Sequence, residues 1–348
     1  FRCNFPCRYL FINRALIYMR ALVLFSGGLD SLLALRIIKD SGIELLALNF
    51  VSPFCRCNRK DGCSAVGQLK KIGVDFRVIS LKEEYLEIVK HPKFGYGSNI
   101  NPCLDCRIMM FKKAKEAMRE TGALFIITGE VLGQRPMSQQ MRQLELIERE
   151  TGLTGLILRP LSAKLLPQTL AEKNGWIKRE ILLDLSGRIR SPQIKLAREF
   201  GINDYPCPSG GCLLTDPGFS RRMKDLIRYS KLALEEIELL KLGRHFRINE
   251  KLKLVVGRDE KENQRLLNLT KEADVCFAPL DTTGPTALAR GLNGEIGIDN
   301  ICAAIVARYC DRKDEGKVLI EKCSPPSKER TVLSIEPIME DELDKLRI

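Results

Sequence analysis

Apolar runs alternate with amphipathic stretches from Ala21 onward, and this alternation restricts the fold more than any other feature of the chain. The run ALVLF precedes a helical pattern over Ser31 to Lys39, and further runs follow with helical stretches between them: IELLALNFV, DFRVISL, ALFIITG and LILRPL. Strands that are apolar along their whole length are typical of parallel sheets covered by helices on both faces. The sequence therefore predicts an α/β domain with a doubly wound parallel sheet.

The sequence pattern changes near Gly243 and divides the chain into segments. Strand and helix signals then alternate over a short span (HFRINEKLKLVVG, RDEKENQRLLNL, DVCFAPL, DNICAAIVARYC), which predicts a second, smaller α+β domain. Met19 could be the natural start, so the residues before it are expected to be a non-native extension or, alternatively, a short anchoring arm. The predicted segments are the extension over 1–18, the α/β domain over 19–218, a helical linker over 219–243, the α+β domain over 244–323 and a polar, then acidic, tail over 324–348.

Composition narrows the functional classes. The 56 Lys and Arg residues outnumber the 44 Asp and Glu residues, and a net charge of +12 favours a polyanionic partner such as a nucleic acid. Thirteen cysteines without a visible secretory signal fit a reducing cytoplasm. No apolar run reaches 18 residues, so no membrane span is predicted. Only two histidines occur, His91 and His245, and both lie outside the motifs, which argues against a hydrolase with a Ser-His or Cys-His pair.

The segment Ser26-Gly27-Gly28-Leu29-Asp30-Ser31 joins the first strand directly to the first helix. Glycines allow a tight turn and a close approach of the backbone to a ligand, and the helix N-terminus directs its amides towards an anion. Serine hydroxyls add donors, so the segment suits a pyrophosphate group. It has neither the GxGxxG spacing of dinucleotide-binding loops nor the Gly-Lys-Ser/Thr ending of the Walker loop. The alternative is a glycine turn with an ordinary helix cap.

This hexapeptide resembles the SGGxDS motif of the PP-loop ATP pyrophosphatases and matches it at every fixed position. The resemblance implies an adenine nucleotide alpha hydrolase-like fold, cleavage of ATP to AMP and pyrophosphate, and activation of a carbonyl oxygen by adenylation. It also implies that Asp30 takes part in catalysis and helps to hold Mg²⁺. The residues expected at the nucleotide are Ser26, Gly27, Gly28, Asp30 and Ser31, joined by Thr128 and Gly129 from the end of the ALFIITG strand.

Cysteines recur in two segments about a hundred residues apart. Cys103 and Cys106 form a CxxC motif where a loop enters a long helix, and Cys207 and Cys212 lie in the segment PCPSGGCLL. Loops of an open sheet converge at the carboxyl ends of its strands, so the two segments are expected to meet. Such cysteines can form a redox pair, ligate zinc, or bind three irons of a 4Fe-4S cluster whose fourth iron takes up sulfide. A persulfide with a resolving thiol, or plain burial, is the alternative.

The segments NPCLDC, TGEVLGQRPMSQ, LRPLSAKLLP and PSGGCLLTDPGFSRR resemble the catalytic domain of tRNA 4-thiouridine and 2-thiouridine synthases, over about residues 19–226. The resemblance implies an ATP-dependent tRNA sulfurtransferase in which Cys103, Cys106 and Cys212 are catalytic and ligate a 4Fe-4S cluster. Cys212 is preferred to Cys207 because GGCLLTD matches the family pattern better. The implied partners are tRNA and a sulfur donor, either a cysteine desulfurase or sulfide.

The remaining cysteines have other expected roles. Cys55, Cys57 and Cys63 are candidate zinc ligands, although no clear fourth ligand accompanies them. Four others lie in apolar strand or helix patterns and are expected in the core: Cys276, Cys302, Cys310 and Cys323.

The segment VVGRDEKENQRLLNLTKEADVCFAPLDTTGPTALARG resembles the RNA-binding NFACT-R domain of ribosome quality-control proteins. The resemblance implies that Arg258, Asn263 and Arg290 contact phosphate or ribose, whereas the alternative is that they support a solvated helix cap and loop. Two other functions compete with tRNA thiolation. One is a PP-loop ligase that uses ammonia rather than sulfur, and the other is a nucleotide-dependent RNA-binding factor without chemistry.

Overall fold

The computed structural model describes residues 19–56, 58–59, 62–203, 205, 211–292, 297–314, 316–324 and 329–348. Its contacts group the chain into two compact units. The first unit comprises the described residues within Phe1–Phe50, Cys57–Ile79 and Arg107–Gly210, and the second comprises those within Val51–Arg56, Ser80–Cys106 and Gly211–Ile348. The predictions for residues 1–18, Cys57 and Cys207 fall outside the described residues.

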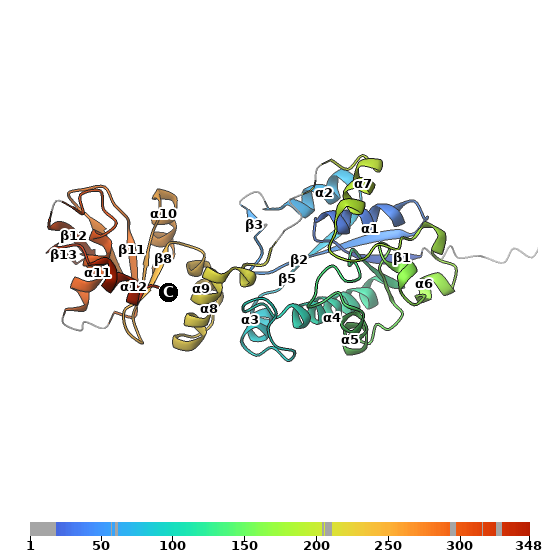
Figure 1. Ribbon diagram of the computed structural model, residues 1–348, viewed down its shortest axis with the longest axis horizontal. Coiled ribbons are helices and arrows are strands. Elements are labelled where there is room, and N and C mark those ends of the chain that lie inside the picture. Colours follow the sequence, from blue (N-terminus) through green and yellow to red (C-terminus); the bar gives the residue numbers. More distant parts are fainter. Residues whose placement is uncertain are drawn as a thin grey trace, which may run out of the picture. The chain divides into compact units, whose positions relative to one another are not determined.

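A five-stranded sheet in the order β5-β2-β1-β6-β7 forms the centre of the first unit (Figure 1). The pairs β1–β2, β1–β6 and β6–β7 are parallel, which confirms the predicted parallel α/β sheet. Strand order reverses on either side of β1, so the loops that follow β1 and β6 leave the sheet next to each other. The strands are β1 (Arg20–Leu24), β2 (Glu44–Val51), β5 (Asp75–Ser80), β6 (Phe125–Thr128) and β7 (Ile157–Leu158), and β3 (Asn58–Arg59) and β4 (Gly62–Cys63) form a separate hairpin.

Helices cover both faces of this sheet, which explains why β1 is buried along most of its length. Helices α1 and α7 lie on one face, and α4 and α5 lie on the other (Figure 1). Helix α6 begins with a capping box, in which Thr169 and Glu172 satisfy each other's backbone amides. The helices are α1 (Leu29–Lys39), α2 (Ser64–Ile72), α4 (Cys103–Thr121), α5 (Met141–Thr151), α6 (Leu170–Lys173) and α7 (Ser191–Glu199), with 3-10 turns η1 (Ala163–Leu165) and η2 (Arg179–Ile181).

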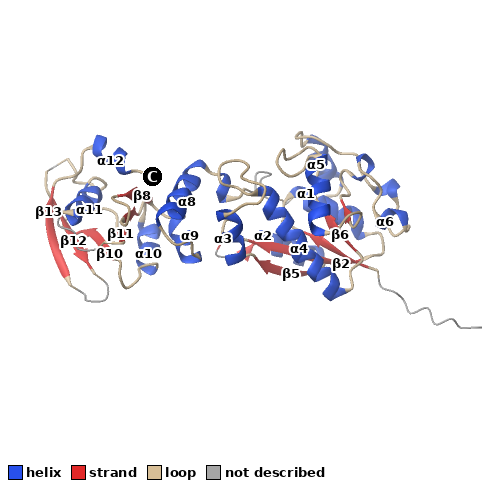
Figure 2. Ribbon diagram, turned by 90° about the horizontal axis from the view of Figure 1, so that it is seen from below, coloured by secondary structure: helices blue, strands red, loops and turns tan. Residues whose placement is uncertain are grey.

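The second unit contains a six-stranded sheet in the order β13-β12-β10-β11-β9-β8, in which the neighbouring strands are antiparallel (Figure 2). The strands are β8 (Arg244–Arg247), β9 (Lys253–Val256), β10 (Val275–Pro279), β11 (Ala287–Arg290), β12 (Val318–Cys323) and β13 (Arg330–Ile335). The helices are α3 (Glu83–Lys90), α8 (Pro217–Tyr229), α9 (Leu234–Leu240), α10 (Glu260–Asn268), α11 (Ile298–Ala307) and α12 (Glu340–Leu346), with the 3-10 turn η3 (Leu213–Thr215).

Alternate residues of the central strands enter two different apolar cores. In β9, Leu254 and Val256 pack with α11, whereas Val255 between them packs with Leu239 of α9 and Leu266 of α10. Successive strand side chains point to opposite faces, so a strand covered on both sides supplies both cores. Three of the cysteines expected in the core are buried, Cys276, Cys302 and Cys310, while Cys323 is half-buried.

The last segment of the chain takes part in this sheet. Strand β13 pairs with β12 over six residues, and Leu343 of α12 is buried in the core. The sequence-based boundary after Cys323 therefore lies between two paired strands. Among the described residues, no helix combines the length and the apolarity needed to cross a membrane.

Candidate nucleotide loop and cysteine cluster

The loop between β1 and α1 is shaped by glycine. Gly27 has a φ of +74°, and a Cβ atom added there would lie 2.9 Å from the Cα atom of Ala65. Both the backbone conformation and the space therefore exclude a larger residue. Gly28 precedes α1 in an extended conformation, and no side chain of the described residues caps the first amides of that helix. These amides are consequently open to an anionic ligand.

The two serines of the loop lie close together. The hydroxyl of Ser31 donates to the carbonyl of Gly28 at 2.8 Å, and its Oγ atom is 3.4 Å from the Oγ atom of Ser26. Ser31 is buried, whereas Ser26 is exposed. Ser31 therefore stabilises the turn, and Ser26 offers its hydroxyl at the surface.

Asp30 is held by an ion pair within the first unit. Its Oδ2 atom accepts hydrogen bonds from Nη2 of Arg190 at 2.7 Å and from Nε2 of Gln134 at 2.8 Å. The side chain of Gln193 supports this arrangement by donating to Oε1 of Gln134 at 3.0 Å. The Oδ1 atom of Asp30 is buried and has no hydrogen-bond partner among the described residues. A cation that contacts this oxygen would therefore meet a preoriented carboxylate.

The end of β6 lies against the same loop. Thr128 pairs with Leu24 of β1, and a Cβ atom on Gly129 would lie 2.5 Å from the backbone nitrogen of Ser31. The structure thus places both residues beside the loop, as the sequence predicted for them. Their role in nucleotide binding stays a prediction.

Glu130, the next residue, is fully buried within a charged network. Its carboxylate is 3.1 Å from Nε of Arg159 and 3.5 Å from Nε of Arg107, and Arg159 in turn contacts Glu148 at 2.6 Å. A buried carboxylate is tolerated only when cations or donors compensate its desolvation. This network fixes the backbone just beyond Gly129.

The predicted sulfur-handling residues lie together in the second unit. Cys103 and Cys106 occupy the first turn of α4, and Cys212 forms an isolated antiparallel bridge with Cys55. The backbone N–H of Leu213 donates to the carbonyl of Phe54 at 2.9 Å, which continues this bridge. The sequence grouped Cys55 with Cys57 and Cys63 rather than with Cys212. Its position in the loop directly after the parallel strand β2 could have indicated that it lies near the other loops at that end of the sheet.

Side chains from α3 and from the loop before α4 position the thiols. The amide of Asn101 contacts Sγ of Cys103 at 2.9 Å, and the phenol of Tyr85 is hydrogen-bonded to Cys106. Asn99 has a φ of +58° and donates through Nδ2 to the carbonyl of Thr215 at 2.8 Å. This contact ties the NPCLDC loop to the segment that carries Cys212.

The environment of Cys212 opposes ionisation of its thiol. Burial raises the pKa of Cys212 to about 12 and outweighs the hydrogen bond from the backbone N–H of Leu214. The thiolates of Cys106, Cys55 and Cys103 would raise this pKa further. Without a compensating cation, the thiol of Cys212 is therefore protonated at neutral pH.

A metal cluster fits this group in donor chemistry but not in position. The donors are thiols, which suit iron, and no histidine accompanies them. Among the described residues, however, no three Cys, His, Asp or Glu side chains are arranged so that they could hold a metal ion. The side chain of Cys63, like all of Cys57 and Cys207, lies outside the described residues.

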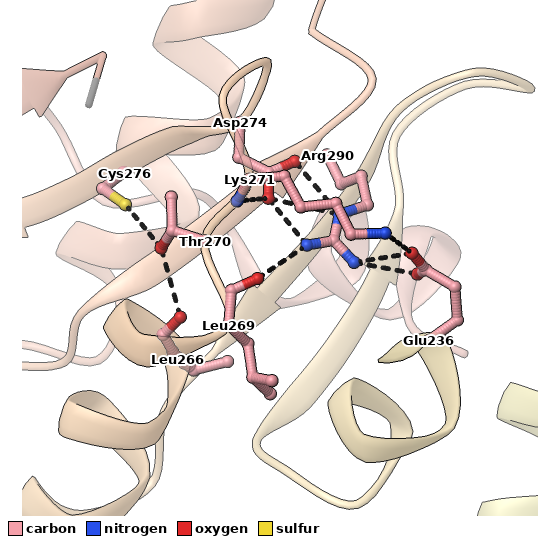
Figure 3. A network of polar contacts seen from close by, with 8 residues as sticks. All are labelled: Glu236, Leu266, Leu269, Thr270, Lys271, Asp274, Cys276 and Arg290. Atoms are coloured by element: carbon pink, nitrogen blue, oxygen red, sulfur yellow. Dashed lines mark hydrogen bonds and ion pairs between the residues drawn. The ribbon is translucent and has the colours of Figure 1, made fainter. Parts of the chain in front are cut away.

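The residues expected at RNA make internal contacts instead. Arg258 forms an ion pair with Glu262 one helical turn away, and the buried Asn263 accepts a hydrogen bond from the backbone N–H of Thr286 at 3.1 Å. Arg290 lies between two carboxylates, 2.8 Å from Glu236 and 2.7 Å from Asp274 (Figure 3). These contacts favour a structural role for the three residues.

Replacing Arg290 with alanine is expected to lower the free energy of unfolding by about 2 kcal/mol, because two largely buried carboxylates lose one partner each and, among the described residues, keep only their contacts with Lys271. The matched control is Arg265→Ala, whose ion pair with Glu238 spans 3.8 Å at the surface and should contribute less than about 0.5 kcal/mol. Urea unfolding monitored by circular dichroism measures both changes. Equal effects of the two substitutions would contradict the structural role of Arg290.

Comparisons with known proteins match separate parts of the chain to two families. Residues 18–164 match the family model described as thiamine biosynthesis protein (ThiI), and residues 243–347 match the NFACT protein RNA binding domain. A probable tRNA sulfurtransferase of Lysinibacillus sphaericus is 33% identical over 166 residues, which are 47% of this chain and 40% of that protein. The tRNA-specific 2-thiouridylase MnmA of Nitratidesulfovibrio vulgaris is 32% identical over 127 residues, which are 33% of this chain and 36% of that protein.

A solved structure, the U34-tRNA thiolase NcsA from Methanococcus maripaludis with its [4Fe-4S] cluster, is 19% identical, and the match covers 64% of this chain and 73% of that one. Its TM-score of 0.34 is too low to support any conclusion. The chain spans about two fifths of the length of the first two curated relatives. The two family models match separate parts of the chain, and the chain therefore combines a PP-loop domain similar to the ThiI family, over residues 18–164, with a domain similar to the NFACT RNA-binding domain, over residues 243–347.

Proposed function

We propose that this chain is an ATP-dependent tRNA sulfurtransferase that adenylates the carbonyl oxygen of a uridine and then replaces that oxygen with sulfur. The observation that carries the proposal is the loop from Ser26 to Ser31, whose glycines and uncapped helix amides suit a pyrophosphate. The thiols of the second unit and the RNA-binding domain add the other parts that such a reaction requires. Curated relatives named tRNA sulfurtransferase and 2-thiouridylase support the same reaction.

In the first step, the uridine oxygen attacks the α-phosphorus of ATP, the bond between the α- and β-phosphates breaks, and pyrophosphate leaves. The amides at the start of α1 and the hydroxyl of Ser26 would stabilise the charge on the leaving group. Asp30, through its unpaired Oδ1 atom, would hold Mg²⁺, which supplies further neutralisation of phosphate charge. Arg190 is close enough to Asp30 to keep the carboxylate oriented.

In the second step, sulfur attacks the activated uridine carbon, and AMP leaves with the original oxygen. We assign the handling of sulfur to Cys103, Cys106 and Cys212. As a persulfide relay, one cysteine carries the outer sulfur, and a second thiol attacks the inner sulfur to form a disulfide as the thiouridine is released. A reductant then restores the thiols. In this relay a cysteine desulfurase supplies sulfur that is already at the persulfide level. Sulfide would instead attack the activated uridine carbon without passing through a persulfide. We also propose a cytoplasmic location.

The test uses the whole chain, purified, with Mg²⁺, ATP and unmodified tRNA. One set of samples receives sulfide, and a parallel set receives a cysteine desulfurase with cysteine and a thiol reductant. We expect one pyrophosphate for each thiouridine formed, with thiouridine detected by mass spectrometry of digested tRNA. Pyrophosphate with incorporation of ammonia instead of sulfur would point to the competing ligase. Binding of tRNA without release of pyrophosphate would favour the other alternative, an RNA-binding factor without chemistry.

A further inference from the structure

A pocket of about 300 Å³ lies within the second unit, and no cysteine is among its lining residues. Arg222 of α8 lines it, together with Arg244 and His245 of β8. Tyr309, which follows α11, and Arg347, which follows α12, complete the polar lining. None of these residues was singled out as a site by the sequence motifs.

Two of the pocket arginines have no carboxylate partner among the described residues. Nε of Arg222 donates to the carbonyl of Gly218 at 3.2 Å, and Nη1 of Arg244 donates to the carbonyl of Gly257 at 3.1 Å. By contrast, Arg347 forms ion pairs with Glu340 and Asp344, both at 3.3 Å. A guanidinium group offers five N–H donors, so Arg222 and Arg244 retain both charge and donors for a ligand.

Packing restrains these two guanidinium groups. The guanidinium carbon of Arg244 lies 4.5 Å from the ring centroid of Tyr309, and that of Arg222 lies 5.7 Å from the ring of Phe219. Burial lowers the pKa of Arg222, and the nearby charges of Arg258 and Arg221 lower it further. The carboxylates of Asp216 and Glu262 raise this pKa but do not cancel the decrease. An anion would relieve this unfavourable concentration of positive charge.

His245 provides an acceptor next to these donors. It is only 3% exposed, and its Nε2 atom lies 2.6 Å from the carbonyl oxygen of Leu242. A carbonyl can only accept, so Nε2 carries the proton and Nδ1 is left with a lone pair. Nδ1 is buried without a hydrogen-bond partner among the described residues. Burial, followed by the charges of Lys253 and Arg222, holds the pKa of His245 well below its ordinary value, so the ring is neutral.

We propose that this pocket binds a phosphate of single-stranded RNA, with Arg222 and Arg244 on the phosphate oxygens and His245 accepting a hydrogen bond from a ribose hydroxyl. The ligand is a ribonucleotide unit because the pocket combines unpaired cationic donors with one buried neutral acceptor. RNA is the source because the pocket residues of β8 and beyond lie within the matched RNA-binding domain. The proposal names a contact site for RNA and does not depend on the sulfurtransferase reaction.

The experiment measures binding of the full chain to a labelled single-stranded oligoribonucleotide by fluorescence anisotropy, as a function of salt. Arg222→Gln and Arg244→Gln should each weaken binding by about tenfold and lower the log-log salt slope by about 0.7. The matched control is Arg228→Gln, an exposed position of the same helix that is outside the pocket lining and removes the same charge. Unchanged melting temperatures would show that the variants remain folded.

Further arms identify the source of the phosphate. A 5′-phosphorylated and a 5′-hydroxyl oligoribonucleotide of one sequence should bind equally if the pocket takes an internal phosphate, and unequally if it takes a chain end. The deoxyribose version should bind more weakly, because Nδ1 of His245 then lacks its donor. Competition by inorganic phosphate alone, with no difference between RNA and DNA, would overturn the assignment to RNA. Pocket variants that bind like the Arg228→Gln control would overturn the site itself.

Failure of this inference and failure of the proposed function give different results. A chain that releases no pyrophosphate and forms no thiouridine, but loses RNA binding in the pocket variants, would refute the function and retain the site. A chain that thiolates tRNA while the pocket variants bind RNA normally would support the proposed function and refute the RNA site in the pocket.

Discussion

Replacing Asp30 with alanine is expected to reduce tRNA-dependent pyrophosphate release by at least about a hundredfold while the chain stays folded. The substitution removes the acceptor of the hydrogen bonds from Arg190 and Gln134, and it removes the buried Oδ1 atom that would hold Mg²⁺. The guanidinium of Arg190 would then lose its contact with the phosphate loop. Release of labelled pyrophosphate from ATP at saturating tRNA measures the effect.

Asp40→Ala is the matched control for this variant. Asp40 follows the last turn of the same helix, its side chain is 73% exposed, and it pairs with Arg36 at 3.0 Å. Exposed pairs of this spacing contribute only about 0.3 to 0.5 kcal/mol, so pyrophosphate release should remain near that of the parent chain. If Asp30→Ala released pyrophosphate at the parent rate, the assignment of this loop to ATP would have to be abandoned.

The second large effect concerns the thiols. Alanine at Cys103, Cys106 or Cys212 is expected to lower thiouridine formation by more than about a hundredfold, whereas the first turnover of pyrophosphate release should persist. The reason is that adenylation uses the phosphate loop, while the thiols act only when sulfur is transferred. Mass spectrometry of tRNA and a pyrophosphate assay on the same samples separate the two steps.

The control variants for the thiols are Cys207→Ala and Cys323→Ala, which should keep most of the thiolation activity. Iron content decides between the two sulfur mechanisms. If the three cysteines ligate a 4Fe-4S cluster, anaerobically purified variants should lose iron together with thiolation. Full thiolation by iron-free parent chain would leave the persulfide relay. Full thiolation by all three alanine variants would exclude both mechanisms.

Local sequence was sufficient to predict the parallel sheet and the loop, because both depend on contiguous patterns. The alternating apolar runs predicted the strands, and SGGLDS placed the turn between β1 and α1. Arg190 and Gln134 were not predicted beside Asp30, since each reaches it from more than a hundred residues away along the chain. Gln134 lies within the segment TGEVLGQRPMSQ, but that segment alone does not indicate which residue its side chain contacts.

The roles of Arg290 and Cys55 in the second unit were not predicted for a related reason. Arg290 follows a motif-like pattern, yet the carboxylates of Glu236 and Asp274 that engage it are visible only once the strands are paired. Cys55 was grouped with Cys57 and Cys63 because they are neighbours in sequence, whereas the structure bridges its backbone to Cys212. Contacts between distant segments decide what a charged or thiol side chain does, and a single sequence does not record them.

The ion pair between Asp30 and Arg190 limits the rotamers that Asp30 can adopt before any ligand arrives. Because Arg190 occupies Oδ2, the unpaired Oδ1 atom has one orientation in which to meet a cation. Binding of Mg²⁺ and ATP would therefore lose less side-chain entropy at this carboxylate than at a freely rotating one.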